Sequence, residues 1–163
     1  MTETGPTLTG IDEGAPVASA REIEVPAGAD VVWDVLTDFE QWPSWNPEIK
    51  TMSIDGPVAE GTEFRWKAGP GTITSRIERV EPPRLIAWTG RTLGIQAIHF
   101  WWLEPRDATT FVRTAESYGG LVARLFRRQL QKVLDNALES GLGSLKEEVQ
   151  RRTAGPPAES ARP

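Results

Sequence analysis

The last third of the sequence carries the clearest structural pattern. Residues 121–152 read LVARLFRRQLQKVLDNALESGLGSLKEEVQRR, in which apolar residues recur every three or four positions. This spacing places apolar side chains on one side of an α-helix. We therefore predict a single long amphipathic helix over 121–152. Glycines 119 and 120 are expected to end the preceding secondary structure. Its apolar stripe contains Leu125, Leu130, Val133, Leu134, Ala137, Leu138, Leu145 and Val149.

Upstream of this helix, the pattern changes to short runs with period two, which is typical of strands. From residue 49 onward, turn-forming residues separate these runs at 55–57, 68–71, 81–83, 93–94 and 106–108. The spacing predicts six consecutive antiparallel strands. Nearer the start, residues 21–25 predict a further strand, residues 30–39 have helical spacing, and prolines 43 and 47 limit the next segment to a short helical turn.

The composition is typical of one soluble globular domain and excludes several classes of function. The 163 residues carry a net charge of -5, with 39% hydrophobic and 25% charged residues. With no cysteine and one histidine, disulfides, thiol catalysis and a multi-histidine metal site are excluded, and we expect neither a metal nor a cofactor. The pI of about 5.0 argues against a nucleic-acid partner. No apolar run suits a signal peptide or a membrane span, so we expect a cytoplasmic protein without stable membrane insertion.

The two ends of the chain differ in composition from the middle. Residues 1–19 and 153–163 are rich in Gly, Pro, Ser, Thr and Glu and offer little apolar surface to bury. We expect both segments to be disordered tails. The sequence therefore predicts one folded domain over residues 20–152.

Several short motifs, taken with the order of the elements, are similar to a known superfamily. They are VPA at 25–27, VWDVLTD at 32–38, WPSWNP at 42–47, PPRL at 82–85 followed by Trp88, and LEP at 103–105 with Thr110 and Glu116 downstream. The chain resembles the START/Bet v 1-like (SRPBCC) superfamily, particularly its bacterial polyketide cyclase/dehydrase branch. This resemblance implies an α+β helix-grip fold: a curved seven-stranded antiparallel sheet around a long C-terminal helix, with two short helices after strand 1 and a hydrophobic cavity inside.

The tight turns fix which residues share a face of the sheet. A turn at 107–108 pairs His99 with Glu116, and a turn at 93–94 pairs Trp88 with His99. The turns at 81–84 and 68–71 add the remaining strands to the same face. That face, which we assign to the concave side, contains Phe64, Trp66, Ile73, Ser75, Ile77, Trp88, His99, Trp101, Leu103, Val112, Thr114 and Glu116.

His99 and Glu116 are the candidate catalytic residues on this face. Burial raises the pKa of a carboxyl group, and a neighbouring imidazole is able to share its proton, so the pair suits proton transfer on a bound ketone or enol. The alternative is that the two side chains only satisfy each other inside an apolar cavity. The candidate ligand-binding residues are Phe64, Trp66, Ile73, Ser75, Ile77, Trp88, Trp101 and Thr114 from the strands and Leu134 and Leu138 from the helix, whereas Trp33, Trp42 and Trp45 are expected to be structural.

The opposite face of the sheet carries an unexpected group of aromatic residues. Phe100, Trp102 and Phe111 lie on this outer face, where they would expose an apolar patch. Two explanations remain open: the patch is the interface of a homodimer, or the strand register is shifted by one residue.

Charged residues add two further expectations. Among the arginines of the predicted strands, Arg79 is the only one that the alternation of side chains allows to face the cavity. A basic cluster at the start of the long helix either attracts an acidic ligand group or a membrane surface, or forms a solvated helix face. This basic cluster consists of Arg124, Arg127, Arg128 and Lys132.

The resemblance and the aromatic face together lead to three functional hypotheses. The first is a protein that binds a small hydrophobic, aromatic or polyketide-like molecule and assists its cyclisation or dehydration. The second is a non-catalytic carrier or sensor for a lipid or isoprenoid. The third is an interaction module like the chaperone-activating members of the superfamily, for which little enclosed cavity is expected.

Overall fold

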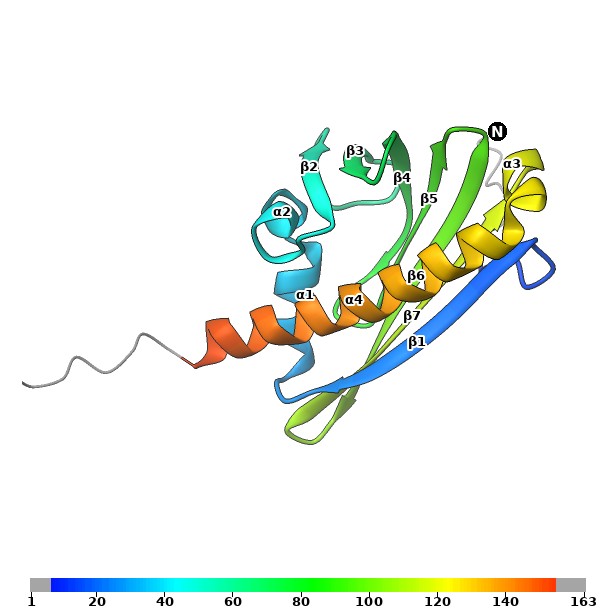
Figure 1. Cartoon of the computed structure of the whole chain (residues 1–163). Coiled ribbons are helices and arrows are strands. Elements are labelled where there is room, and N and C mark those ends of the chain that lie inside the picture. Colours follow the sequence, from blue (N-terminus) through cyan, green and yellow to red (C-terminus); the bar gives the residue numbers. More distant parts are fainter. Residues whose placement is uncertain (1–6, 155–163) are drawn as a thin grey trace, which may run out of the picture.

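A computed structural model describes residues 7–154 of the chain (Figure 1). The expected disorder of residues 1–6 and 155–163 lies outside the described residues. The elements follow one another as β1 (Val17–Val25), α1 (Ala29–Thr37), the 3-10 helix η1 (Phe39–Gln41), α2 (Trp42–Trp45), β2 (Ile49–Ile54), β3 (Glu63–Ala68), β4 (Thr72–Glu81), β5 (Leu85–Thr92), β6 (Ile95–Arg106), β7 (Thr109–Gly119), α3 (Leu121–Leu125) and α4 (Arg127–Thr153).

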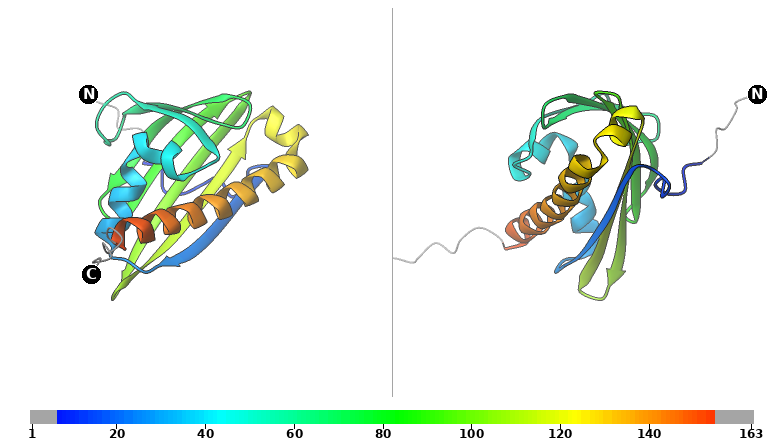
Figure 2. Two further views of the ribbon diagram at one scale, coloured as in Figure 1. Left: turned by 60° about the vertical axis from the view of Figure 1, so that its left-hand side comes forward. Right: turned by 45° about the vertical axis from the view of Figure 1, so that its right-hand side comes forward.

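The seven strands form one curved antiparallel sheet in the order β1-β7-β6-β5-β4-β3-β2. Helix α4 crosses the concave side of the sheet, and α1 and α2 lie on the same side (Figures 1 and 2). This arrangement confirms the predicted helix-grip fold. Among the described helices, none has the length and apolar character needed to cross a membrane.

The predicted strand register is confirmed. His99 pairs with Glu116 and with Trp88, Ile77 pairs with Trp88, and Trp66 pairs with Ile73. The turns that fix this register contain Leu93 and Asp107, both with positive φ angles, as tight hairpins require. A register shift therefore does not explain the outer aromatic residues.

The predicted orientation of Arg79 is wrong because β4 contains a bulge. The register shifts between Ile77 and Arg79, so that Arg79 pairs with Ala87 and faces the convex side. There its guanidinium donates a hydrogen bond to the carbonyl oxygen of Leu8 (3.2 Å) and pairs with Glu81.

The predicted long helix is interrupted at Phe126, which separates α3 from α4. Phe126 has φ -111° and ψ 28°, outside the helical region. Apolar spacing continues across the interruption through Val122, Phe126 and Leu130, so the periodicity gave no sign of it. The chain enters α3 through Gly120, whose φ of 99° suits glycine.

The convex face is covered by the N-terminal segment. Leu8 and Ile11 pack, as Trp102 does, against the buried cluster of Leu85, Ala87 and Phe100, and Phe100 is completely buried. The backbone N–H of Asp12 donates a hydrogen bond to Ser117 Oγ (3.1 Å). Strand β1 also begins at Val17, within the range we assigned to the tail, because its start pairs with the end of β7.

The expected exposed aromatic patch is therefore absent from the described part of the chain. Besides the cover over Phe100, the guanidinium of Arg113 lies 5.3 Å from the ring centre of Trp102, and that of Arg106 lies 4.2 Å from the ring centre of Phe111. The argument for a homodimer through these three aromatic residues loses its basis.

Candidate functional site

A cavity of about 640 Å³ lies between the concave face of the sheet and helices α2, α3 and α4. The side chains around it are predominantly apolar. From the predicted set, it is lined by His99, Glu116, Trp66, Ile73, Ser75, Trp88, Trp101 and Leu138. The predicted catalytic pair and most of the predicted ligand-binding residues thus surround one space.

Four predicted ligand-binding residues do not line the cavity. Phe64 and Ile77 are fully buried in the main core, where the ring of Phe39 stacks on Phe64 with a centroid distance of 4.9 Å. Leu134 packs against Val17 of β1 instead. The fourth, Thr114, lies beneath His99 and is completely buried. Correct strand alternation and helical spacing placed these residues inside the protein, but part of that interior is solid core.

His99 is held in one orientation by Thr114. The hydroxyl of Thr114 donates a hydrogen bond to the carbonyl oxygen of Phe100 (3.1 Å), so it accepts one from His99 Nε2–H at 2.7 Å. This arrangement leaves Nδ1 as the unprotonated ring nitrogen. Nδ1 lies 3.4 Å from Glu116 Oε2 and has no hydrogen-bond partner.

Burial keeps both members of the pair uncharged. It raises the pKa of Glu116 to about 8 and lowers the pKa of His99 to about 3, because the protein interior disfavours either charge. At neutral pH the site therefore presents a protonated carboxyl group beside a neutral imidazole. One group is able to donate a proton and the other to accept one.

Aromatic rings enclose the imidazole on two sides. The ring centre of His99 lies 4.8 Å from that of Trp88 and 5.4 Å from that of Trp101. These rings limit the approach of water to the faces of the imidazole. The edge of the ring that carries Nδ1 faces Glu116. A planar ligand entering the cavity would meet the same ring faces.

Four buried polar side-chain atoms in the described residues lack a hydrogen-bond partner, and all four belong to residues that line the cavity. They are Trp45 Nε1, Thr92 Oγ1, His99 Nδ1 and Trp101 Nε1. By contrast, Trp42 Nε1 donates to the carbonyl oxygen of Leu36 (2.9 Å), and Trp66 Nε1 donates to Ser75 Oγ (3.1 Å). Since buried polar groups are normally paired, this concentration of unpaired atoms distinguishes the cavity from the rest of the described residues.

The sequence analysis missed part of the cavity wall. Trp42 and Trp45, which we expected to be structural, both line it, as does Tyr118. Burial and the nearby Glu116 raise the pKa of the Tyr118 hydroxyl. Tyr118 shares its face of β7 with Glu116, so strand alternation was a usable signal for this residue. The helical part of the wall contains Val122, Phe126, Leu130, Val133, Ala137 and Gly141.

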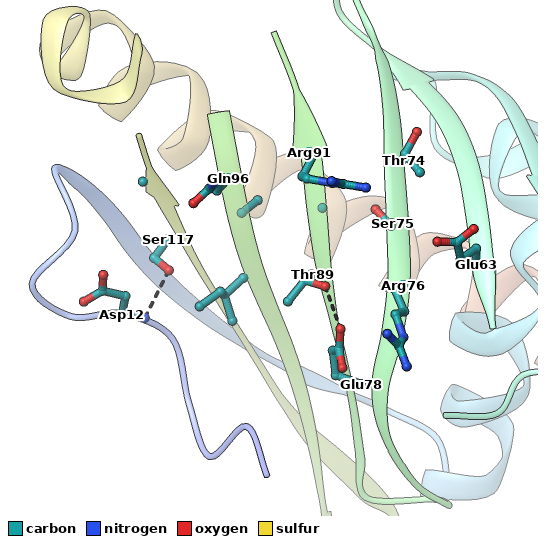
Figure 3. Close-up of a pocket in the computed structure, with 14 residues that line it drawn as sticks. Asp12, Glu63, Thr74, Ser75, Arg76, Glu78, Thr89, Arg91, Gln96 and Ser117 are labelled. Carbon is teal, nitrogen blue, oxygen red and sulfur yellow. Dashed lines mark hydrogen bonds between the residues drawn. The ribbon is translucent and has the colours of Figure 1, made fainter. Parts of the chain in front are cut away.

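A second hollow, of about 480 Å³, lies on the convex face (Figure 3). Its side chains carry charges of both signs, including Glu63, Arg76, Glu78 and Arg91. Thr89 Oγ1 donates a hydrogen bond to Glu78 there (2.8 Å). None of the unpartnered buried polar atoms belongs to a residue that lines this hollow, so we take the concave cavity as the candidate functional site. Within residues 7–154, no group of three or more His, Asp or Glu side chains is placed to hold a metal ion.

Fold and cavity together define a helix-grip protein with an internal hydrophobic site. Residues 16–150 match the family model described as "Polyketide cyclase / dehydrase and lipid transport", and the chain belongs to this family. Among curated proteins, no sequence matches the chain significantly.

Solved structures with the same fold come from several organisms. A hypothetical protein from Helicobacter pylori is 17% identical, with a TM-score of 0.75 over 88% of this chain and 98% of that one. The ZhuI aromatase/cyclase from Streptomyces sp. R1128 is 21% identical, with a TM-score of 0.74 over 83% and 94% of the two chains. A norcoclaurine synthase mutant from Thalictrum is 16% identical, with a TM-score of 0.67 over 83% and 95%. At these identities the likeness shows the fold alone.

Proposed function

We propose that this protein binds a small, mainly apolar aromatic molecule bearing oxygen substituents and promotes its cyclisation or dehydration by proton transfer. The observation that carries the proposal is that all four unpartnered buried polar atoms of the described residues, His99 Nδ1 among them, belong to residues that line one predominantly apolar cavity. The cavity volume of about 640 Å³ suits a ligand of two to four fused rings or a folded chain of similar size. The indole N–H groups of Trp45 and Trp101 are donors suited to ligand oxygens.

The pair of His99 and Glu116 suits the elimination of water from a β-hydroxy ketone. Nδ1 of His99 takes the proton from the carbon next to the carbonyl, and the electron pair of that C–H bond forms the new C=C bond. The C–O bond to the hydroxyl breaks as Glu116 gives this oxygen its proton, and water leaves. The products on the protein are an imidazolium and a carboxylate. Proton transfer from Nδ1 back to Glu116, across the 3.4 Å between them, restores the starting state.

The same proton transfers serve ring closure. Proton removal by His99 generates an enolate, which attacks a second carbonyl of the same folded chain, and Glu116 protonates the resulting alkoxide. The cavity contributes by holding the chain in a compact conformation, which replaces an entropically costly search with a bound geometry. The presence of a cavity counts against the interaction-module hypothesis, which expects little enclosed space.

Ligand binding is tested with 1-naphthol and 1-methylnaphthalene, which have similar shapes. Only 1-naphthol carries an oxygen atom. We expect 1-naphthol to quench tryptophan fluorescence and bind more tightly. Gly141 lines the cavity, and a Cβ placed there meets no atom within 4 Å, so Gly141→Leu fills the cavity and abolishes binding. Gly143→Leu, in the same helix and outside the lining, is the matched control and retains binding. Equal binding by both variants contradicts the proposed site.

Catalysis is tested by deuterium exchange into 2-tetralone, a bicyclic ketone with acidic hydrogens next to its carbonyl. We expect the protein to accelerate exchange, followed by NMR. Glu116→Gln and His99→Gln are expected to lower the acceleration by at least tenfold while affinity is retained, because each replaces a titrating group with a neutral amide of similar size. Tight binding without acceleration in the unaltered protein would instead identify the non-catalytic carrier, for lipids or isoprenoids, as the correct function.

A further inference from the structure

The end of the molecule around the cavity opening exposes large apolar side chains. Five of the six large hydrophobic side chains that the described residues expose lie there, each between 52% and 68% exposed. Three of them, Leu93, Phe126 and Val133, also line the cavity and so mark its opening. We call the five residues the apolar rim; they are Leu93, Leu121, Leu125, Phe126 and Val133.

The apolar rim is contributed by segments that pack together. Helix α3 lies at the end of α4, beside the end of the sheet (Figures 1 and 2). The β5–β6 turn approaches α3 closely: a Cβ on Gly94 would lie 2.9 Å from Val122. Leu93 in this turn is thereby held next to the exposed residues of α3. A grouped set of apolar side chains of this kind marks an interaction surface more often than scattered ones do.

The charged residues in the helical part of the apolar rim are all positive. The basic cluster of Arg124, Arg127, Arg128 and Lys132 is exposed, and no acidic residue occurs between positions 120 and 134. No ion pair joins any of these four cations to another residue within 7–154. The whole chain has a net charge of -5, so this basic end contrasts with the rest of the protein.

We propose that the apolar rim and the basic cluster dock the cavity opening on an anionic lipid bilayer. Leucine and phenylalanine side chains insert among lipid chains, and interleaved arginines bind anionic headgroups, which is the composition of a membrane-surface helix. Docked in this way, the cavity opens toward the bilayer, and an apolar ligand exchanges with the membrane without crossing water. The apolar residues surround an opening instead of forming a groove, which favours a fluid lipid surface over an acidic protein partner.

Vesicle co-sedimentation tests the proposal with the full-length protein. We expect binding to vesicles of equal phosphatidylglycerol and phosphatidylcholine, little binding to pure phosphatidylcholine, and weakening as salt is raised. Arg124→Glu with Arg127→Glu is expected to lower vesicle affinity by at least about tenfold. The matched control is Arg65→Glu with Arg76→Glu, which changes the net charge equally on the convex face, where both side chains are exposed and neither lines the cavity, and retains vesicle binding (Arg76 is shown in Figure 3).

A second variant separates the apolar contribution. Leu121 and Leu125 are exposed and do not line the cavity, so replacing both with serine is expected to weaken vesicle binding and leave 1-naphthol affinity unchanged. This affinity also reports that each variant is folded, and it separates failure of the docking proposal from failure of the proposed function. Lack of binding to anionic vesicles at low salt, as expected if this surface serves an acidic protein, overturns the proposal. Equal loss in the convex-face control overturns it as well.

Discussion

One face of one sheet is solid core at one end and cavity at the other. On β4, Ile77 is fully buried, whereas Ile73, four residues away on the same face, lines the cavity. The difference arises from the helices above them. Over Ile77 lie α1 and the C-terminal half of α4, which contribute Val32, Leu36, Leu142, Leu145 and Val149 to one continuous core.

Above the cavity, part of the α4 surface consists of small or outward-facing residues. Ala137 and Gly141 line the cavity from α4, and Val133 remains 57% exposed. Helix α1 approaches the cavity wall with a single residue, Leu36. The comparison teaches that inward alternation in a strand identifies the interior, and that only the opposing helix decides whether this interior is core or binding site.

The largest expected effect tests this difference directly with two isoleucines. Ile77→Ala is expected to lower the free energy of unfolding by about 3 kcal/mol, because it leaves a void in close-packed core. Ile73→Ala is expected to cost about 1 kcal/mol, because its side chain already borders empty space. Urea unfolding measures both values. Equal losses at the two positions would mean that the cavity end is packed like the core.

The sequence predicted the cavity wall well because tight turns determine it. The turns at 93–94 and 107–108 connect adjacent strands with no spare residues, so the pairing of Trp88, His99 and Glu116 followed from counting. The bulge in β4 was not predictable in this way. We predicted a turn in which Glu81 pairs with Arg84, whereas the actual turn pairs Glu81 with Leu85 and so contains one more residue. The bulge between Ile77 and Arg79 compensates for this extra residue, so that Ile77 still pairs with Trp88. The register at the cavity was therefore correct while Arg79 was assigned to the wrong face.

Other features left no periodic signal in the sequence. Leu8 and Ile11 are isolated apolar residues in a polar segment, so their packing on Phe100 required knowledge of the convex surface. Strand alternation also could not separate Phe64 and Ile77 from the cavity-lining residues, since that separation depends on the helices packed over them. Proton positions on His99 depend on Thr114, whose hydroxyl orientation is set by the carbonyl of Phe100.

The second expected effect extends the comparison to the convex face. Deleting residues 1–16 removes Leu8 and Ile11 and exposes Phe100, so we expect the free energy of unfolding to fall by about 2 kcal/mol. Deleting residues 1–6 is the control, because it removes neither contact. Sedimentation velocity is expected to show self-association of the longer deletion only, through the newly exposed aromatic surface. Unchanged stability in both would show that the N-terminal segment contributes no cover.

The third effect is a dependence of stability on pH that comes from the cavity end. The pKa of Glu116 is about 8 when folded and 4.5 otherwise, so between these values the folded state binds the extra proton and stability falls as pH rises. The pKa of His99 is about 3 when folded and 6.5 otherwise, so between these values stability rises with pH. The two slopes oppose each other from pH 4.5 to 6.5.

From pH 6.5 to 8 only the contribution of Glu116 remains. Stability is expected to fall there by up to about 1.4 kcal/mol per pH unit. Glu116→Gln is expected to abolish this fall, because glutamine does not titrate. Urea unfolding at a series of pH values measures the slope; an identical slope in the variant would show that Glu116 is not protonated at neutral pH.

The smallest effect compares a satisfied indole with an unpartnered one. Trp42→Phe removes an N–H group that donates to the carbonyl oxygen of Leu36, so it is expected to cost about 1 kcal/mol of stability for the hydrogen bond, in addition to the lost ring contacts. Trp101→Phe removes an N–H group that has no partner in the protein, so no hydrogen bond within the fold is lost.

The effect of Trp101→Phe is expected in ligand binding instead. Affinity for 1-naphthol falls by about fivefold, the equivalent of one hydrogen bond, beyond any change in affinity for 1-methylnaphthalene. Equal changes for the two ligands would show that the Trp101 N–H group does not contact the ligand oxygen, and that the oxygen lies nearer Trp45 or Thr92.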